Sequence, residues 1–101
     1  MSMGKDLNSL KRRFKPMDYE SSLKRVAIYC FDHSSTISGF VQSVIFLSLV
    51  DFLDRNYGMN VDDMEEDDVD DMISILFDIY EPLIKMYHKQ IKIRKNKEYG
   101  R

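Results

Sequence analysis

ISGFVQSVIFLSLVDFLDRN, which spans residues 37–56, is the stretch that decides the fold of this 101-residue chain. Eleven of these residues are large and apolar, and on a helix they leave few faces polar. Such a helix must be buried on several sides. A chain this short has few other elements that could cover it, so we expect a second subunit to supply part of the covering surface.

Both ends of this helix carry boundary signals. The hydroxyls of Ser35 and Thr36 can accept hydrogen bonds from the free N–H groups of its first turn. Gly58 suits the left-handed conformation that ends many helices. We therefore predict a helix over about residues 37–56.

A second helix is predicted upstream, beginning near Glu20. Its apolar residues follow the i, i+3, i+4, i+7, i+8 spacing of an amphipathic helix: Leu23, Val26, Ala27, Cys30 and Phe31. Residues 25–31, RVAIYCF, are also rich in types that favour extended structure, so a buried strand is the alternative. The helical spacing starts at Leu23, ahead of the β-branched run, and favours the helix.

A basic stretch, KRRFKPMDY, occupies residues 11–19. Apolar and other residues alternate in its centre, and alternation indicates a strand: Arg13, Phe14, Lys15, Pro16 and Met17. Pro16 permits only an edge or lightly bonded strand, because proline has no N–H to donate. Residues 1–10 are polar and aperiodic, and we expect a flexible arm there.

A third helical pattern lies in the C-terminal part of the chain. Its apolar residues keep the helical period across Pro82, where the missing N–H predicts a kink or a break: Val69, Met72, Ile73, Leu76, Tyr80, Leu83, Ile84, Tyr87 and Ile91. Residues 89–97 also alternate, so the tail is either a basic strand or the end of this helix. We predict a helical extension over 59–101, kinked at Pro82.

The net charge of -2 conceals three blocks of unequal charge. Residues 1–58 carry +2, residues 59–81 contain ten acids and no base, and residues 82–101 carry +6. Acids at the start of a helix and bases at its end are favoured by the helix dipole, which explains much of this order without a partner. A charged interaction surface is the alternative.

Residues that could carry catalysis or bind a metal are few. His33 lies in a predicted turn, His88 on a basic helix and Cys30 on an apolar stripe. The chain has no Cys/His pairing for zinc and no glycine-rich phosphate loop. A calcium-loop match beginning at Asp54 fails at Met59, where the turn needs glycine. We expect no enzymatic activity, no cofactor and no bound metal.

Targeting signals are also weak. The first residues, MSMGKDLNSLKRRF, contain no apolar stretch, so we expect no secretory signal peptide. Residues 33–50 carry no formal charge, but their hydroxyl and amide groups make them too polar for a lipid-facing helix. The single cysteine permits no internal disulfide. We expect a cytoplasmic protein that does not bind a membrane.

Residues 12–56 contain, in order, a basic strand, a helix, a short turn and a capped helix. The residues that define this order are Arg13-Phe14-Lys15-Pro16-Met17, Leu23, Val26, Cys30, the turn at His33–Ser35, Thr36-Ile37, Val41, Val44 and Ile45. Without a gap, this pattern resembles the ribbon-helix-helix family of small dimeric DNA-binding proteins. The resemblance implies a mainly α fold, in which residues 11–58 form a short N-terminal strand and two helices, followed by the helical extension.

In that family, the two strands of a homodimer pair antiparallel and enter the major groove of double-stranded DNA. The resemblance therefore assigns three sets of residues. Base contacts would come from Arg13, Lys15 and Met17. Phosphate contacts would come from Lys11, Arg12, Ser35 and Thr36. The dimer core would contain Phe14, Ile37, Val41, Val44 and Ile45.

Two functional hypotheses follow. The first is a homodimer, or a higher oligomer, that binds double-stranded DNA sequence-specifically as a small transcriptional repressor or as an accessory protein in plasmid or phage DNA processing. The second is an all-helical protein-interaction module, acting as an adaptor, an inhibitor or an acidic nucleic-acid mimic. In the second, residues 59–81 would bind a protein partner.

Overall fold

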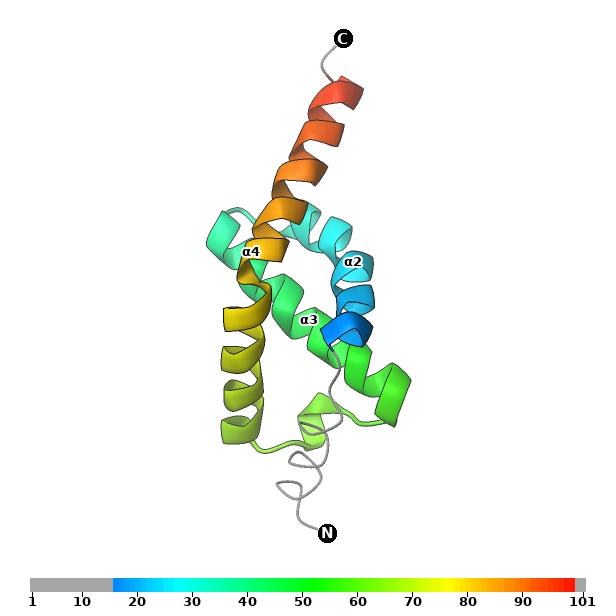
Figure 1. Ribbon diagram of the computed structural model, residues 1–101, viewed down its shortest axis with the longest axis vertical. Helices are drawn as coiled ribbons and strands as arrows, with labels where there is room; N and C mark the ends of the chain where they lie inside the picture. The colour runs from blue at the N-terminus through cyan, green and yellow to red at the C-terminus, as the bar shows by residue number, and fades with distance from the viewer. Residues whose placement is uncertain (1–15, 100–101) are drawn as a thin grey trace.

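The computed structural model describes residues 16–99, and this part of the chain is built from helices (Figure 1). In chain order they are α2 (Pro16–His33), α3 (Ile37–Tyr57), the short 3-10 helix η1 (Val61–Asp63) and α4 (Glu66–Tyr99). Figure 1 shows α2 and α3 running in opposite directions, and the last turns of α4 extending beyond both. The molecule is 57 Å long and α4 has 34 residues. A helix of that length spans roughly 51 Å, so α4 sets the long dimension.

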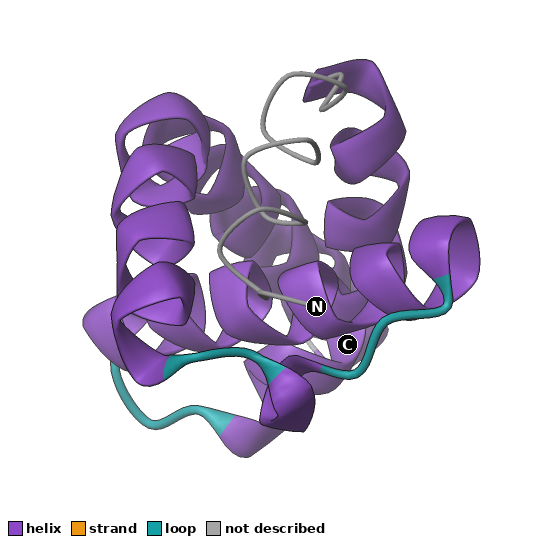
Figure 2. Ribbon diagram, turned by 90° about the horizontal axis from the view of Figure 1, so that it is seen from below, coloured by secondary structure: helices purple, strands orange, loops and turns teal. Residues whose placement is uncertain are grey.

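The predicted ribbon-helix-helix fold is wrong. That fold needs an extended strand through residues 13–17, but Pro16 and Met17 begin α2, and Figure 2 shows no strand in the described part of the chain. Proline is favoured at the first helical position, because its ring presets the helical φ and its missing N–H is not needed there. The expectation of a mainly helical chain agrees with the structure. Residues 11–15 lie outside the described part.

Two ambiguous segments are helical. Residues 25–31 belong to α2, where Ala27 and Cys30 are buried while Ile28 and Tyr29 face solvent. Residues 89–97 belong to α4. The strand alternatives for both segments are therefore wrong, because in each the neighbouring helical period continues without interruption.

The predicted ends of the central helix are confirmed. The Thr36 side chain accepts a hydrogen bond from the Gly39 N–H at 3.0 Å, which caps the start of α3. Gly58 adopts the left-handed conformation, with φ of 62°, and its N–H donates to the carbonyl of Asp54 at 3.1 Å. A glycine is needed here because a side chain at this φ would be strained.

Tyr19 joins all three long helices. It is fully buried on α2, and its hydroxyl donates to the main-chain carbonyl of Ile45 on α3 at 2.6 Å. Its ring meets Phe52 of α3 edge-on, with centroids 5.8 Å apart, and lies 5.0 Å from Tyr80 of α4. Burial raises the Tyr19 pKa far above its usual range. The hydroxyl therefore stays a neutral donor.

Asp51 is the polar link between α2 and α3. Its carboxylate accepts a hydrogen bond from the buried Ser22 hydroxyl at 2.9 Å and lies 3.6 Å from the Arg25 guanidinium. Arg55, one turn further along α3, lies 3.1 Å from the other carboxylate oxygen. The partly buried Asp51 carboxylate is tolerated because these donors satisfy it.

One chain covers most of the apolar surface of α3. Three residues assigned to a dimer core, Val41, Val44 and Ile45, are buried within the single subunit. Ile37 remains 47% exposed, and Phe14 lies outside the described residues. α2 and α4 pack against α3 and cover most of its centre, where Phe46 remains 41% exposed.

Among residues 16–99, α3 alone has the length and hydropathy of a membrane-spanning helix. Its mean hydropathy is 1.6 over eighteen residues, and 44% of that window is buried inside the protein. The core helix of a soluble protein meets the same two criteria, so this observation is weak evidence for a membrane span.

α4 continues through Pro82 as one helix. Figure 1 shows the ribbon changing direction near its middle, as the kink predicted there requires. The N-terminal half packs its buried residues Met72 and Leu76 into the core, and the C-terminal half crosses towards α2.

Replacing Tyr19 tests whether this side chain holds the three helices together. Tyr19→Phe removes only the hydroxyl, so the free energy of unfolding should fall by about 1 kcal/mol. Tyr19→Ala leaves a cavity among all three helices and should cost about 3–5 kcal/mol. Urea unfolding followed by circular dichroism measures both. Tyr29→Phe is the matched control, since Tyr29 is 56% exposed; equal losses for the two phenylalanine variants would contradict the assignment.

Candidate functional site

The side chains that could support catalysis do not converge. Cys30 is buried, and this burial raises the pKa of its thiol, which disfavours the reactive thiolate. His88 packs between the rings of Phe31 and Phe40, with centroids 5.1 and 4.9 Å away. His33 instead stacks on Tyr29 at 4.0 Å. In residues 16–99, no three His, Cys, Asp or Glu side chains are grouped to hold a metal.

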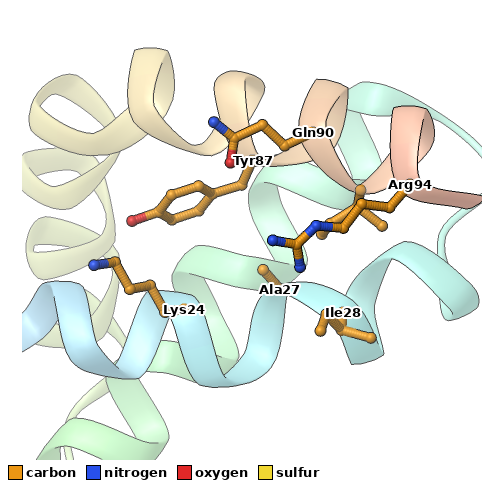
Figure 3. Close-up of a pocket in the computed structure, with 7 residues that line it drawn as sticks. Lys24, Ala27, Ile28, Tyr87, Gln90 and Arg94 are labelled. Atoms are coloured by element: carbon orange, nitrogen blue, oxygen red, sulfur yellow. The ribbon is translucent and has the colours of Figure 1, made fainter.

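A groove lies between α2 and the C-terminal half of α4 (Figure 3). Its volume is about 250 Å³. The residues that line this groove, called the α2–α4 groove below, are Lys24, Ala27, Ile28, Tyr87, Gln90, Ile91 and Arg94. Figure 3 shows Tyr87 extending from α4 towards Lys24 of α2, and Arg94 of α4 lying over Ala27.

The α2–α4 groove combines an apolar floor with two cations. Ala27 is buried, and Ile28 is 56% exposed at the edge. Arg94 is exposed and forms no ion pair with the described side chains of residues 18–97, and Lys24 pairs with Glu20 at 3.7 Å, with a side chain that remains 65% exposed. Apolar surface between two exposed cations is suited to a partner that carries both apolar and carboxylate groups.

Tyr87 fixes one wall of this groove. Its hydroxyl donates to the Glu20 carboxylate at 3.3 Å, which ties α4 to α2. Burial, together with the neighbouring Glu20 charge, raises the pKa of Tyr87 to about 12. The phenol therefore stays neutral at physiological pH, and Glu20 keeps this hydrogen bond while it neutralises part of the Lys24 charge.

A second hollow, of about 500 Å³, lies at the start of α3. It brings the predicted phosphate contacts Ser35 and Thr36 beside His88, Lys92 and Lys95 of α4. The Thr36 oxygen already accepts from the Gly39 N–H. Lys95 is paired with Asp32 and lies 4.9 Å from the centre of the Phe31 ring. Lys92 is exposed and unpaired within the described residues.

The other predicted DNA contacts are not assembled by the described part of the structure. Met17 belongs to the first turn of α2. Lys11, Arg12, Arg13 and Lys15 lie outside the described residues.

A stripe of exposed apolar residues runs along the outside of α4. This stripe was not predicted from the sequence, because the buried stripe dominates the helical period of the same helix. The exposed fractions are 43% for Ile75, 49% for Ile79, 46% for Met86 and 46% for Ile93. The exposed Pro82 lies between them. We call these five residues the outer seam.

Comparisons with protein families, with characterised proteins and with solved structures find no match to this chain.

Proposed function

We propose that the chain is a helical protein-interaction module, and that it binds an acidic amphipathic helix of a partner protein in the α2–α4 groove. The observation that carries the proposal is the pairing of an apolar floor with Lys24 and Arg94 in one groove. This binding mode places the apolar face of a helix in a groove and its charged residues at the rim.

The surroundings of the groove support a protein partner. Ile28 at the edge of the groove and the adjacent Tyr29 on α2 are each 56% exposed, so apolar surface continues from the groove to Tyr29 outside it. Exposed apolar surface bordered by charges is typical of protein-interaction sites. The planar guanidinium of Arg94 can bind a carboxylate through two parallel hydrogen bonds, which favours Asp or Glu on the incoming helix.

Binding of double-stranded DNA is the second candidate. The observation that favours it is the hollow at the start of α3, where Ser35 and Thr36 lie beside Lys92. The basic half of α4, beyond Lys85, would supply further phosphate contacts. Because α2 begins at Pro16, this candidate uses helices and involves no strand.

Charge reversal tests the groove. The probe is a fluorescent synthetic helix with leucines on one face and glutamates beside them. Arg94→Glu should weaken its binding about tenfold, because a like charge replaces the carboxylate partner. The matched control is Lys97→Glu, which makes the same charge change on an exposed part of α4 outside the groove.

Fluorescence anisotropy measures the two affinities. Binding that weakens for Arg94→Glu and stays near the parent value for Lys97→Glu supports the groove. No binding by the parent, or equal loss in both variants, would overturn the proposal.

Salt dependence tests the DNA candidate. Affinity for a mixed-sequence duplex should fall steeply between low and physiological salt, since each phosphate contact releases counterions. Lys92→Ala should reduce both the affinity and the slope of this dependence, whereas Lys24→Ala, which removes an equal charge outside the hollow, should not. Anisotropy at several salt concentrations gives both quantities. Absence of binding at low salt removes this candidate.

A further inference from the structure

α4 has two apolar faces, and only one of them is covered. The covered face carries Met72, Leu76 and Ile84, which are buried against α2 and α3. The other face is the outer seam, whose four large side chains are each more than two-fifths exposed. Packing within the subunit needs only one apolar face on α4. The exposure of the outer seam is therefore not explained by the core.

The spacing of the outer seam is that of a coiled coil. Together with the exposed Lys89, which takes the one polar position, its five residues alternate between four and three residues apart along α4: Ile75, Ile79, Pro82, Met86, Lys89 and Ile93. This spacing keeps residues aligned along one side of a helix and is the pattern by which two helices pack side by side.

Along one side of the outer seam, acidic residues are followed by basic residues. Asp71, Asp78, Lys85 and Lys92 are spaced seven residues apart, are exposed, and lie on one side of the seam. Two acids are therefore followed by two bases. In a parallel pair of α4 helices, the charged edges of the two helices would lie on opposite sides of the contact, so their charges could not pair. An antiparallel pair would instead place the acidic half of each helix against the basic half of the other.

We propose that a second copy of this chain docks on the outer seam, so that the two α4 helices pack antiparallel. One alignment satisfies both charge pairs: Asp78 faces Lys85 of the partner subunit, and Asp71 faces Lys92 of the partner subunit. In the same alignment, Ile79 packs on Pro82 of the partner subunit, and Ile75 packs on Met86 of the partner subunit. The two-fold axis passes near Glu81.

Pro82 determines where the contact is closest. The proline ring clashes with the carbonyl one turn earlier, and the helix relieves this clash by opening on the proline side. That side, which carries the outer seam, becomes convex. Two convex faces meet at their centres and separate towards their ends, so the contact is centred on residues 75–86. A contact limited to these few turns is small, so we expect a weak dimer.

This dimer goes beyond the proposed function and uses a different face. The α2–α4 groove is lined by Tyr87, Gln90 and Ile91, none of which belongs to the outer seam. Arg94→Glu should therefore leave self-association near the parent value. Failure of either proposal can be recognised without reference to the other.

Sedimentation of the full chain over a range of concentrations tests the docking. The parent should show a concentration-dependent monomer–dimer equilibrium. Ile79→Lys should weaken the dimer at least tenfold, because it buries an unpaired charge in the seam. The matched control is Ile28→Lys, which makes the same change at an equally exposed isoleucine on α2 and should not affect dimerisation. Circular dichroism melting establishes that both variants fold.

A charge exchange tests the antiparallel register. Asp71→Lys and Lys92→Asp should each weaken the dimer several-fold, because each places like charges opposite one another. The double variant exchanges both charges and should restore the parent affinity. In a parallel dimer, positions 71 and 92 would lie roughly 30 Å apart and no restoration could occur.

Three results would overturn the proposal. The first is a chain that stays monomeric at every concentration, which would leave the seam to a different partner. The second is a dimer unaffected by Ile79→Lys, and the third is a double variant no better than the single ones.

Discussion

The burial of α3 is the constraint on which the rest of the structure depends. Its apolar residues extend around most of the helix, so α2 and α4 must both pack against it. Tyr19 joins the three helices, because its hydroxyl bonds a carbonyl of α3 and its ring contacts both α3 and α4. Asp51 adds a polar connection to α2. With α3 covered in this way, a single chain provides its own core.

The length of α4 produces the candidate surfaces. Its N-terminal half is needed to cover α3, but the helix continues well beyond this task. The C-terminal half approaches α2 and is tied to it by the hydrogen bond from Tyr87 to Glu20. The α2–α4 groove and the basic hollow at the start of α3 both arise from this approach. Both hollows therefore lie against the C-terminal half of α4.

The order of charges along α4 has two effects: it stabilises the helix itself, and it leaves exposed charges that a partner can contact. Acids in the first turn and bases towards the end stabilise the helix through its dipole, which needs no partner. The described ion pairs consume few of these charges: Lys85 pairs with Glu81, and Lys95 pairs with Asp32. Apart from the pair of Glu81 with Lys85, the described acids and bases of α4 do not neutralise each other, since a helix holds its two ends apart. They remain available to partners.

The sequence by itself determined α3 and its two ends, because helical period and capping are local properties: Thr36 and Gly58 were predicted as the two caps of α3, and both are confirmed. The strand predicted at residues 13–17 was wrong at Pro16 and Met17, which begin α2. The short alternation there indicated a strand, but the preference of proline for the first turn of a helix prevails. Only the tertiary structure decided which apolar residues remain exposed and which distant side chains meet. Lys24 and Arg94, or Ser35 and Lys92, become neighbours solely because α4 folds back over α2 and α3, and no local pattern in the chain records that packing.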